Sequence, residues 1–105
     1  METPAGYSRR GGAHVGYRSG TWPFGKIEIA GGTVTVSVLG GRRTLSVADV
    51  LRVEPLGAFS TDGGPGVRIF FRGEHWEEHV DFYSMTARAE IIAKLRAAGF
   101  NALEK

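Results

Sequence analysis

Apolar and polar residues alternate with a period of two over much of this sequence, which is the pattern of half-buried β-strands. Ile27 and Ile29 lie on one side of such an alternation, and Val34 and Val36 continue it after Gly31-Gly32. Adjacent glycines provide the positive φ values of a two-residue hairpin turn. The pattern therefore predicts an antiparallel hairpin with one buried face.

The alternation returns several times before residue 83. It covers residues 44–47, 50–53 and 67–72, and a stretch that contains Val80 and Phe82. Turn-forming residues separate most of these stretches, and Pro55 predicts that the strand before it is short or lies at an edge. We therefore expect about six to seven short antiparallel strands.

The period lengthens to that of a helix after residue 86. Four apolar residues fall on one helical stripe: Ile91, Ile92, Leu95 and Ala98. Ser84 or Thr86 can cap the first turn, and Gly99 suits the left-handed position after the last turn, as in a Schellman motif. We predict a helix at about residues 86–98. The expected fold is mainly β (α+β), an antiparallel, partly open β-barrel or sandwich capped by this one C-terminal α-helix.

Residues 1–20 follow neither period. They contain five glycines and few branched apolar residues, so they bury too little surface to offset their ordering entropy. We predict a flexible Gly/Arg-rich arm at 1–20 and a single folded domain at 21–105. A short edge strand is the alternative, because Ala13, Val15 and Tyr17 alternate with polar residues.

Charge and composition narrow the function classes. The arm holds Arg9, Arg10 and Arg18 against Glu2, while residues 21–105 have ten basic and ten acidic groups. The predicted domain thus has no overall attraction to nucleic acids or other polyanions. The chain of 105 residues has no cysteine, no secretory signal pattern and no apolar run near the roughly 20 residues of a membrane span. We expect a cytoplasmic protein without a transmembrane segment.

Three segments carry a resemblance to a known superfamily: the strand entry at 21–29, the corner at 46–50, and residues 81–84 leading to 87–91. Together they resemble small bacterial members of the pleckstrin-homology-like (PH-like) superfamily. The resemblance implies a partly open barrel of two roughly orthogonal sheets plugged by a C-terminal helix. It also implies binding of phosphoinositides and membranes, or docking of peptides and proteins.

Lipid-binding members of that superfamily use basic residues on the first two strands and the loop between them. Here the corresponding loop is Gly31-Gly32, and Lys26 is the nearest preceding base. A two-residue turn cannot surround a polyphosphorylated head group, so we expect no specific phosphoinositide binding. The basic pair Arg42 and Arg43 lies beside the next turn, where it is either a solvated hairpin tip or a basic contact.

The segment His75-Trp76-Glu77-Glu78-His79 matches the H-x-x-E-H pattern of a class of zinc peptidases, which requires a helix. The neighbouring alternation predicts a strand instead, in which His75, Glu77 and His79 share one face about 6 to 7 Å apart. The residues nearby supply no further His or Cys, so we expect no metal site. The sequence also lacks a G-x-S-x-G elbow and a nucleotide-binding glycine motif. We therefore predict no catalytic residues, no cofactor and no enzyme activity.

The sheet face opposite the predicted core offers an interaction surface. Arg68, Phe70 and Arg72 alternate with the apolar residues of their strand, so Phe70 points outward if those residues are core. Arginine and aromatic residues are enriched in interface hot spots. Cover by another part of the chain is the alternative for Phe70. Trp22 and Trp76 are interpreted as packing residues.

We therefore predict a non-catalytic interaction module that binds an unidentified protein or a second copy of itself. Its contacts would be Arg68, Phe70 and Arg72 with His75, Glu77 and His79 on the adjoining strand. One alternative is a barrel that binds a small molecule or a lipid. A weaker alternative is contact with an anionic membrane or a nucleic acid through Arg9, Arg10 and Arg18 of the arm.

Overall fold

Strands make up most of the chain. The computed structural model describes residues 6–57, 65–74, 76–84 and 86–102, which form seven β-strands and one α-helix. In chain order these are β1 (Tyr7–Val15), β2 (Arg18–Ala30), β3 (Thr33–Val38), β4 (Gly41–Ser46), β5 (Val50–Leu56), β6 (Gly66–Arg72), β7 (Glu77–Tyr83) and α1 (Arg88–Ala97).

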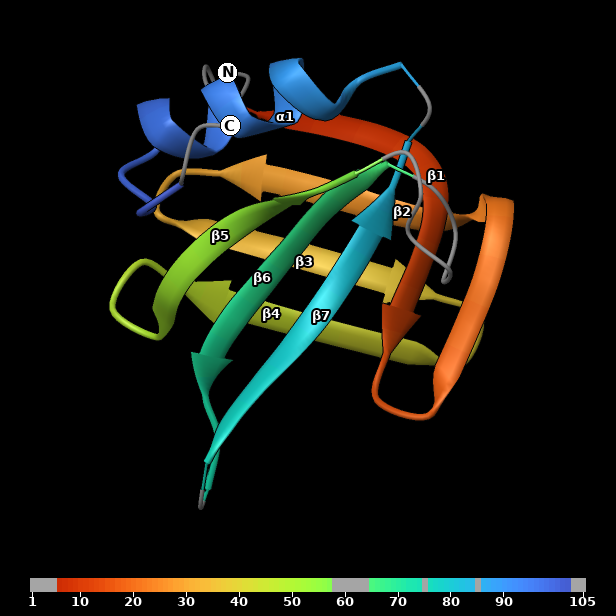
Figure 1. Ribbon diagram of the computed structural model, residues 1–105, viewed down its shortest axis with the longest axis horizontal. Coiled ribbons are helices and arrows are strands. Elements are labelled where there is room, and N and C mark those ends of the chain that lie inside the picture. The colour runs from red at the N-terminus through yellow and green to blue at the C-terminus, as the bar shows by residue number, and fades with distance from the viewer. Residues whose placement is uncertain (1–5, 58–64, 75, 85, 103–105) are drawn as a thin grey trace.

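The strands pair antiparallel in one sheet with the order β4-β3-β2-β1-β7-β6-β5. Figure 1 shows β5, β6 and β7 crossing diagonally in front of β3 and β4, with α1 along the upper end of the molecule. The bent β1 pairs with β2 and with β7 and so joins the two layers. Strands β4 and β5 remain the two edges of the described sheet, so the barrel is not closed. The predicted mainly β fold with one terminal helix is confirmed.

The core lies between the two layers and beneath α1. Ile27, Ile29, Val34 and Val36 are all buried, as the period-two pattern predicts. The largest fully buried apolar side chains come from both layers and from the helix: Phe82, Ile27, Ile69, Ile91, Leu95, Val34, Val36, Val53, Val67 and Val80. Removal of apolar area from water is the dominant favourable term in folding, so α1 stabilises the fold by covering the end of the sheet.

The helix begins two residues later and ends one residue earlier than predicted. Ala87 is the N-cap residue, and its N–H donates to the Oγ of Ser84 at 3.1 Å. At the other end Gly99 has φ 100°, and the N–H of Phe100 donates to the carbonyl of Leu95 at 2.9 Å. The N–H of Gly99 also donates to the carbonyl of Arg96, at 3.0 Å. These are the two bonds of a Schellman motif, so the predicted helix end is confirmed.

The N-terminal segment differs from its prediction. Strand β1 occupies residues 7–15 in the middle of the sheet, and β2 begins at Arg18. Tyr7 packs against the core, and Arg9 forms an ion pair with Glu90 of α1 at 3.2 Å. The prediction of a flexible arm is therefore wrong for residues 7–20, and the folded domain includes residues ahead of 21. The misleading signal was composition, because β1 buries Gly11 and Gly12 where a strand normally buries large side chains.

Candidate functional site

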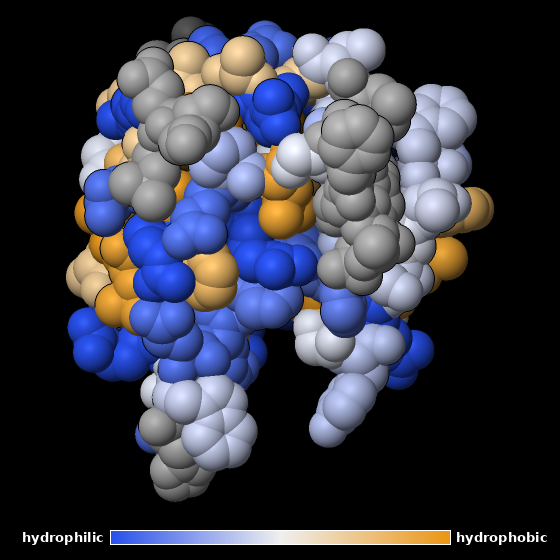
Figure 2. All heavy atoms as spheres, in the orientation of Figure 1, coloured by the Kyte–Doolittle hydropathy of each residue, from blue (hydrophilic) through white to orange (hydrophobic). Residues whose placement is uncertain are grey.

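The outward faces of β5, β6 and β7 form a polar surface, which Figure 2 shows as a largely hydrophilic area. The β6–β7 register places Phe70 opposite His79 and Arg72 opposite Glu77. Arg68 lies on the same face of β6, two residues before Phe70. The structure therefore brings together five of the six residues predicted for an interaction face. The sixth, His75, lies outside the described residues.

A buried carboxylate, Asp81, organises this face. Its side chain is completely buried, and it accepts two hydrogen bonds from Arg68, from Nε to Oδ1 at 2.8 Å and from Nη2 to Oδ2 at 3.0 Å. The hydroxyl of Tyr83 donates to Oδ2 at 3.0 Å, and Nδ1 of His79 lies 3.2 Å from Oδ1. Buried charges persist in proteins when they are paired and hydrogen-bonded, as this one is. We call these four residues the Asp81 cluster.

Sequence reasoning missed Asp81, although a signal was present. The carboxylate stands between Val80 and Phe82, whose side chains are both buried in the core. By strand alternation Asp81 therefore belongs to the outward face, directly across from Arg68. An acidic and a basic residue at directly opposed positions of neighbouring strands are expected to pair.

Arg52 of β5 covers the rest of the face. It donates to Glu54 at 2.8 Å and to both carboxylate oxygens of Glu77, at 2.9 and 3.3 Å. Its guanidinium carbon also lies 3.9 Å from the centroid of the Phe70 ring, and the His79 ring meets Phe70 edge-on at 5.7 Å. Phe70 is thus half-buried, and Arg52 and His79 of the same chain already contact its ring.

The Arg52–Glu77 contact leads to a prediction about ionisation. Hydrogen bonds from Arg52 hold the pKa of the Glu77 carboxyl below its usual value. We expect Arg52→Gln to raise that pKa back toward the usual value, as followed by carboxyl-carbon NMR during a pH titration. The contact favours the folded chain above the unfolded pKa of Glu77 and is lost as the pH falls through the lower, folded value.

Arg72→Gln is the matched control, because Arg72 lies opposite Glu77 in the register but the hydrogen bonds come from Arg52. We expect the pKa of Glu77 to change much less in this variant. Equal shifts in both variants would show that general charge, and not the direct contact, sets the pKa of Glu77.

The described part of the H-x-x-E-H segment, residues 76–79, does not form a helix. Glu77 and His79 lie in strand β7, as predicted from the surrounding alternation. Within the described ranges, no three His, Asp or Glu side chains are placed to hold a metal ion. The zinc-peptidase arrangement requires a helix, and residues 77–79 of the motif lie in a strand.

A second surface arises where β1 and β2 part. Gly11 pairs with Gly25 and Ala13 pairs with Gly20, so Gly12 alone faces the four residues from Thr21 to Phe24. The extra residues form a bulge in β2. The Trp22–Pro23 peptide bond within it is cis, and Arg10 Nη1 donates to the carbonyl of Pro23 at 3.4 Å. We call residues 21–24 the β2 bulge.

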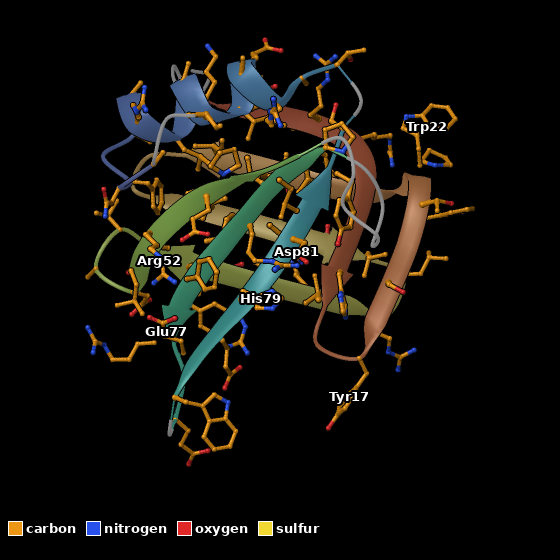
Figure 3. All side chains as sticks on the ribbon, viewed as in Figure 1. Tyr17, Trp22, Arg52, Glu77, His79 and Asp81 are labelled. Atoms are coloured by element: carbon orange, nitrogen blue, oxygen red, sulfur yellow. The ribbon has the colours of Figure 1, made fainter. Side chains whose placement is uncertain are left out.

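The β2 bulge exposes aromatic side chains. Trp22 is 70% exposed and Phe24 is 52% exposed, while Tyr17 in the β1–β2 turn is fully exposed. Figure 3 shows Trp22 and Tyr17 on the β2 side of the molecule, away from Arg52, Glu77 and Asp81. Trp76 is 71% exposed near the β6–β7 turn. The interpretation of Trp22 and Trp76 as packing residues is wrong, because apolar content does not reveal that these positions lie at a bulge and a turn.

A cavity of about 490 Å³ lies beside the β2 bulge. It is bounded by β1, the start of β2 with the bulge, and the chain from Tyr83 toward α1. The described lining residues are Arg9, Arg10, Gly11, Gly12, Ala13, His14, Ser19, Gly20, Thr21, Trp22, Tyr83, Ser84 and Thr86. Tyr83 connects the cavity to the Asp81 cluster through its hydroxyl.

The basic residues do not form one patch. Arg9 and Arg10 lie on β1, where Arg9 pairs with Glu90 of the helix. Arg18 of β2 lies beside the β3–β4 turn, next to Gly40 and Gly41. On β4, Arg43 lies over the ring of Phe71, with its guanidinium carbon 4.6 Å from the centroid, while Arg42 is exposed.

No helix within the described ranges has both the length and the apolar character needed to cross a bilayer. Comparison with known proteins found no family model, no curated protein and no solved structure that matches this chain.

Proposed function

We propose that this chain is a non-catalytic binding module, similar to PH-like domains, that docks a partner protein on the β2 bulge. Seven strands followed by one helix support the resemblance, since PH-like domains consist of a partly open barrel plugged by a C-terminal helix. The binding role rests on the surface and not on the fold, because one fold serves many functions.

The observation that carries the proposal is the exposure of Trp22 and Phe24 on the β2 bulge. A scattered exposed apolar residue needs no explanation, but two large aromatic side chains within three residues, both more than half exposed, form a local apolar surface. Tryptophan is among the residues that dominate binding energy at protein interfaces. Such a surface gains free energy when a partner removes it from water.

The bulge is also held in place before any partner binds. Arg10 contacts the carbonyl of Pro23, and Gly25 anchors the following strand against Gly12 and Ala13 of β1. A surface that is ordered in the free protein loses less entropy on binding, which leaves more of the contact energy as affinity.

The polar face of β5–β7 fits this role less well than the sequence suggested. Its charges are paired within the chain, Arg68 with Asp81 and Arg52 with Glu77. A partner would have to break those pairs or add to them without gaining much apolar contact. We therefore place the centre of the interface at the β2 bulge.

The two alternatives from the sequence have less support. A ligand inside the barrel would need the space that Phe82, Ile69 and Leu95 fill. Contact with an anionic membrane or nucleic acid was assigned to a basic arm, but Arg9 and Arg10 belong to a central strand and Arg9 is paired with Glu90.

The test compares three forms of the chain as bait in an extract of the cells that make it. We expect a specific partner to be retained by the wild type and lost from the Trp22→Ser/Phe24→Ser variant, since a hot-spot residue contributes about 2 kcal/mol, or about thirtyfold in affinity. Trp76→Ser is the matched control, because Trp76 is equally exposed but lies near the β6–β7 turn. Wild type, double variant and control retaining the same proteins would contradict the proposal.

A second copy of the chain is the competing occupant. Sedimentation velocity over a range of concentrations would detect it as a dimer that the double variant lacks and Trp76→Ser keeps. That result would replace the partner protein with self-association at the same surface.

A further inference from the structure

We infer that the cavity beside the β2 bulge is a binding site for a small organic oxyanion, a carboxylate or phosphate carried on a flat apolar group. The inference goes beyond the proposed docking of a protein, because it concerns the cavity itself and needs no partner. It rests on the size of the cavity, its charge, its hydrogen-bonding groups and its aromatic wall.

The cavity has the size of a small-ligand site. Its volume of about 490 Å³ falls within the range of about 300 to 1,000 Å³ that such sites usually occupy. Gly11 and Gly12 of β1 belong to the lining and add no side chains to the cavity. A Cβ atom at Gly12 would lie 3.0 Å from the carbonyl oxygen of Gly20 and 3.5 Å from the Tyr83 ring. The narrow approach of these strands therefore depends on glycine.

The charge of the lining favours an anion. Arg9, Arg10 and His14 line the cavity, and its described lining residues include no aspartate or glutamate. An ion pair with Glu90 partly neutralises the charge of Arg9. Among the described residues, the Arg10 side chain donates one hydrogen bond, to the Pro23 carbonyl at 3.4 Å. Most of its five N–H donors are thus available to a ligand. A guanidinium can form a bidentate pair with a carboxylate or phosphate.

Hydroxyl groups complete the polar side of the cavity. Ser19, Thr21, Ser84 and Thr86 all belong to the lining. The Oγ of Ser84 already accepts a hydrogen bond from the N–H of Ala87, so its own proton is available for donation. Donors of this kind suit the several lone pairs of an oxyanion.

The aromatic residues of the lining favour a ligand whose remaining part is a flat apolar group. Trp22 and Tyr83 both line the cavity, and a flat ring can pack against an indole or phenol in an offset or edge-on arrangement. Two arginines, one of them paired with Glu90, match one or two negative charges. A polyanion such as a nucleic acid would need a longer track of positive charge than this cavity has.

The direct experiment is a titration of the isotope-labelled full chain, followed by two-dimensional amide NMR. The probes are phenyl phosphate, benzoate and the neutral benzamide. We expect saturable shifts at the amides of Gly11, Gly12 and Thr86 with the two anions, at dissociation constants of about 1 mM for fragments of this size. The relative affinity of phenyl phosphate and benzoate identifies which oxyanion the site prefers. Benzamide should bind at least about fivefold more weakly, because it has the ring without the charge.

Two variants locate the charge. We expect Arg10→Gln to weaken binding of the preferred anion at least about fivefold. Arg42→Gln should leave binding unchanged, because Arg42 lies on β4 and does not line the cavity. Should the NMR spectrum show that Arg10→Gln displaces the β2 bulge, His14→Gln serves as the second variant and should weaken binding in the same direction. The inference is overturned if neither anion shifts these amides or if benzamide binds as tightly as the anions. It is also overturned if the cavity variants bind the preferred anion as tightly as Arg42→Gln does. Loss of partner capture in the Trp22→Ser/Phe24→Ser variant tests the proposed function separately, without these probes.

Discussion

Replacing Asp81 with alanine is expected to destabilise the protein more than any other single change on its polar face. The substitution removes a fully buried carboxylate and leaves Arg68, whose side chain is 26% exposed, without both of its hydrogen bonds to Asp81. Breaking a buried ion pair by removing one partner costs about 3 to 5 kcal/mol. Because Arg68 can regain some water, we expect the lower end of that range. In a chain of this size it corresponds to a fall in melting temperature of at least about 12 °C, measured by calorimetry or circular dichroism.

The matched control is Glu77→Ala, which removes an exposed carboxylate from the same face. Exposed ion pairs contribute little to stability, so its melting temperature should stay close to that of the wild type. A rescue variant sharpens the test. Asp81→Ala/Arg68→Met should be more stable than Asp81→Ala alone, because the second change removes the guanidinium that has lost its two hydrogen bonds to Asp81. Equal melting temperatures for Asp81→Ala and Glu77→Ala would show that the Asp81 cluster is not a structural centre.

The parts of the fold that were predictable from the sequence depend on local chemistry. The Gly31-Gly32 turn joins β2 and β3, with Ala30 paired to Thr33, because alternation and a turn dipeptide specify each other over a few residues. The end of α1 was predictable for the same reason. Gly99 adopts a positive φ that suits glycine, and Phe100 follows it at the position that completes the motif.

Strand β1 was not predictable because its role depends on distant neighbours. Its residues Gly11 and Gly12 look flexible when the chain is considered alone. In the fold a Cβ atom at Gly11 would collide with the carbonyl oxygen of Tyr83, a residue 72 positions later in the numbering of the chain. Glycine is needed there because two strands approach closely, and composition cannot distinguish that requirement from flexibility.

In the candidate sites, too, local features were predictable from the sequence and features that depend on strand pairing were not. Alternation correctly placed Arg68, Phe70 and Arg72 on one face, since parity along a strand is a local property. To predict that Arg52 covers Phe70, one would have to know that β5 lies beside β6. To predict that Trp22 is exposed, one would have to know the register between β1 and β2, which leaves four residues opposite one. Pairing between strands therefore determines which side chains are exposed on each surface, and this pairing is the feature that is hardest to predict from a single sequence.

The second large effect is expected for Gly25→Ala, which tests the central position of β1. A Cβ atom at Gly25 would lie 2.5 Å from the carbonyl carbon of Gly12, 2.7 Å from the nitrogen of Ala13 and 2.8 Å from the carbonyl oxygen of Gly11. All three are backbone atoms of β1, so no side chain can rotate to make room. Overpacking costs about 1 to 3 kcal/mol, and we expect the upper end here because the strands themselves must separate. The expected fall in melting temperature is about 12 °C.

Gly32→Ala is the control for this variant, because its Cβ atom would meet only the Val47 side chain, at 3.9 Å. Alanine also restricts the unfolded chain, so Gly32→Ala should melt at or slightly above the wild-type temperature. If Gly25→Ala melted with the wild type, β1 would not lie against β2 as described. The β2 bulge and the cavity beside it would then lose their structural basis, since both exist because Gly25 and Gly20 of β2 are held against β1 on either side of the bulge.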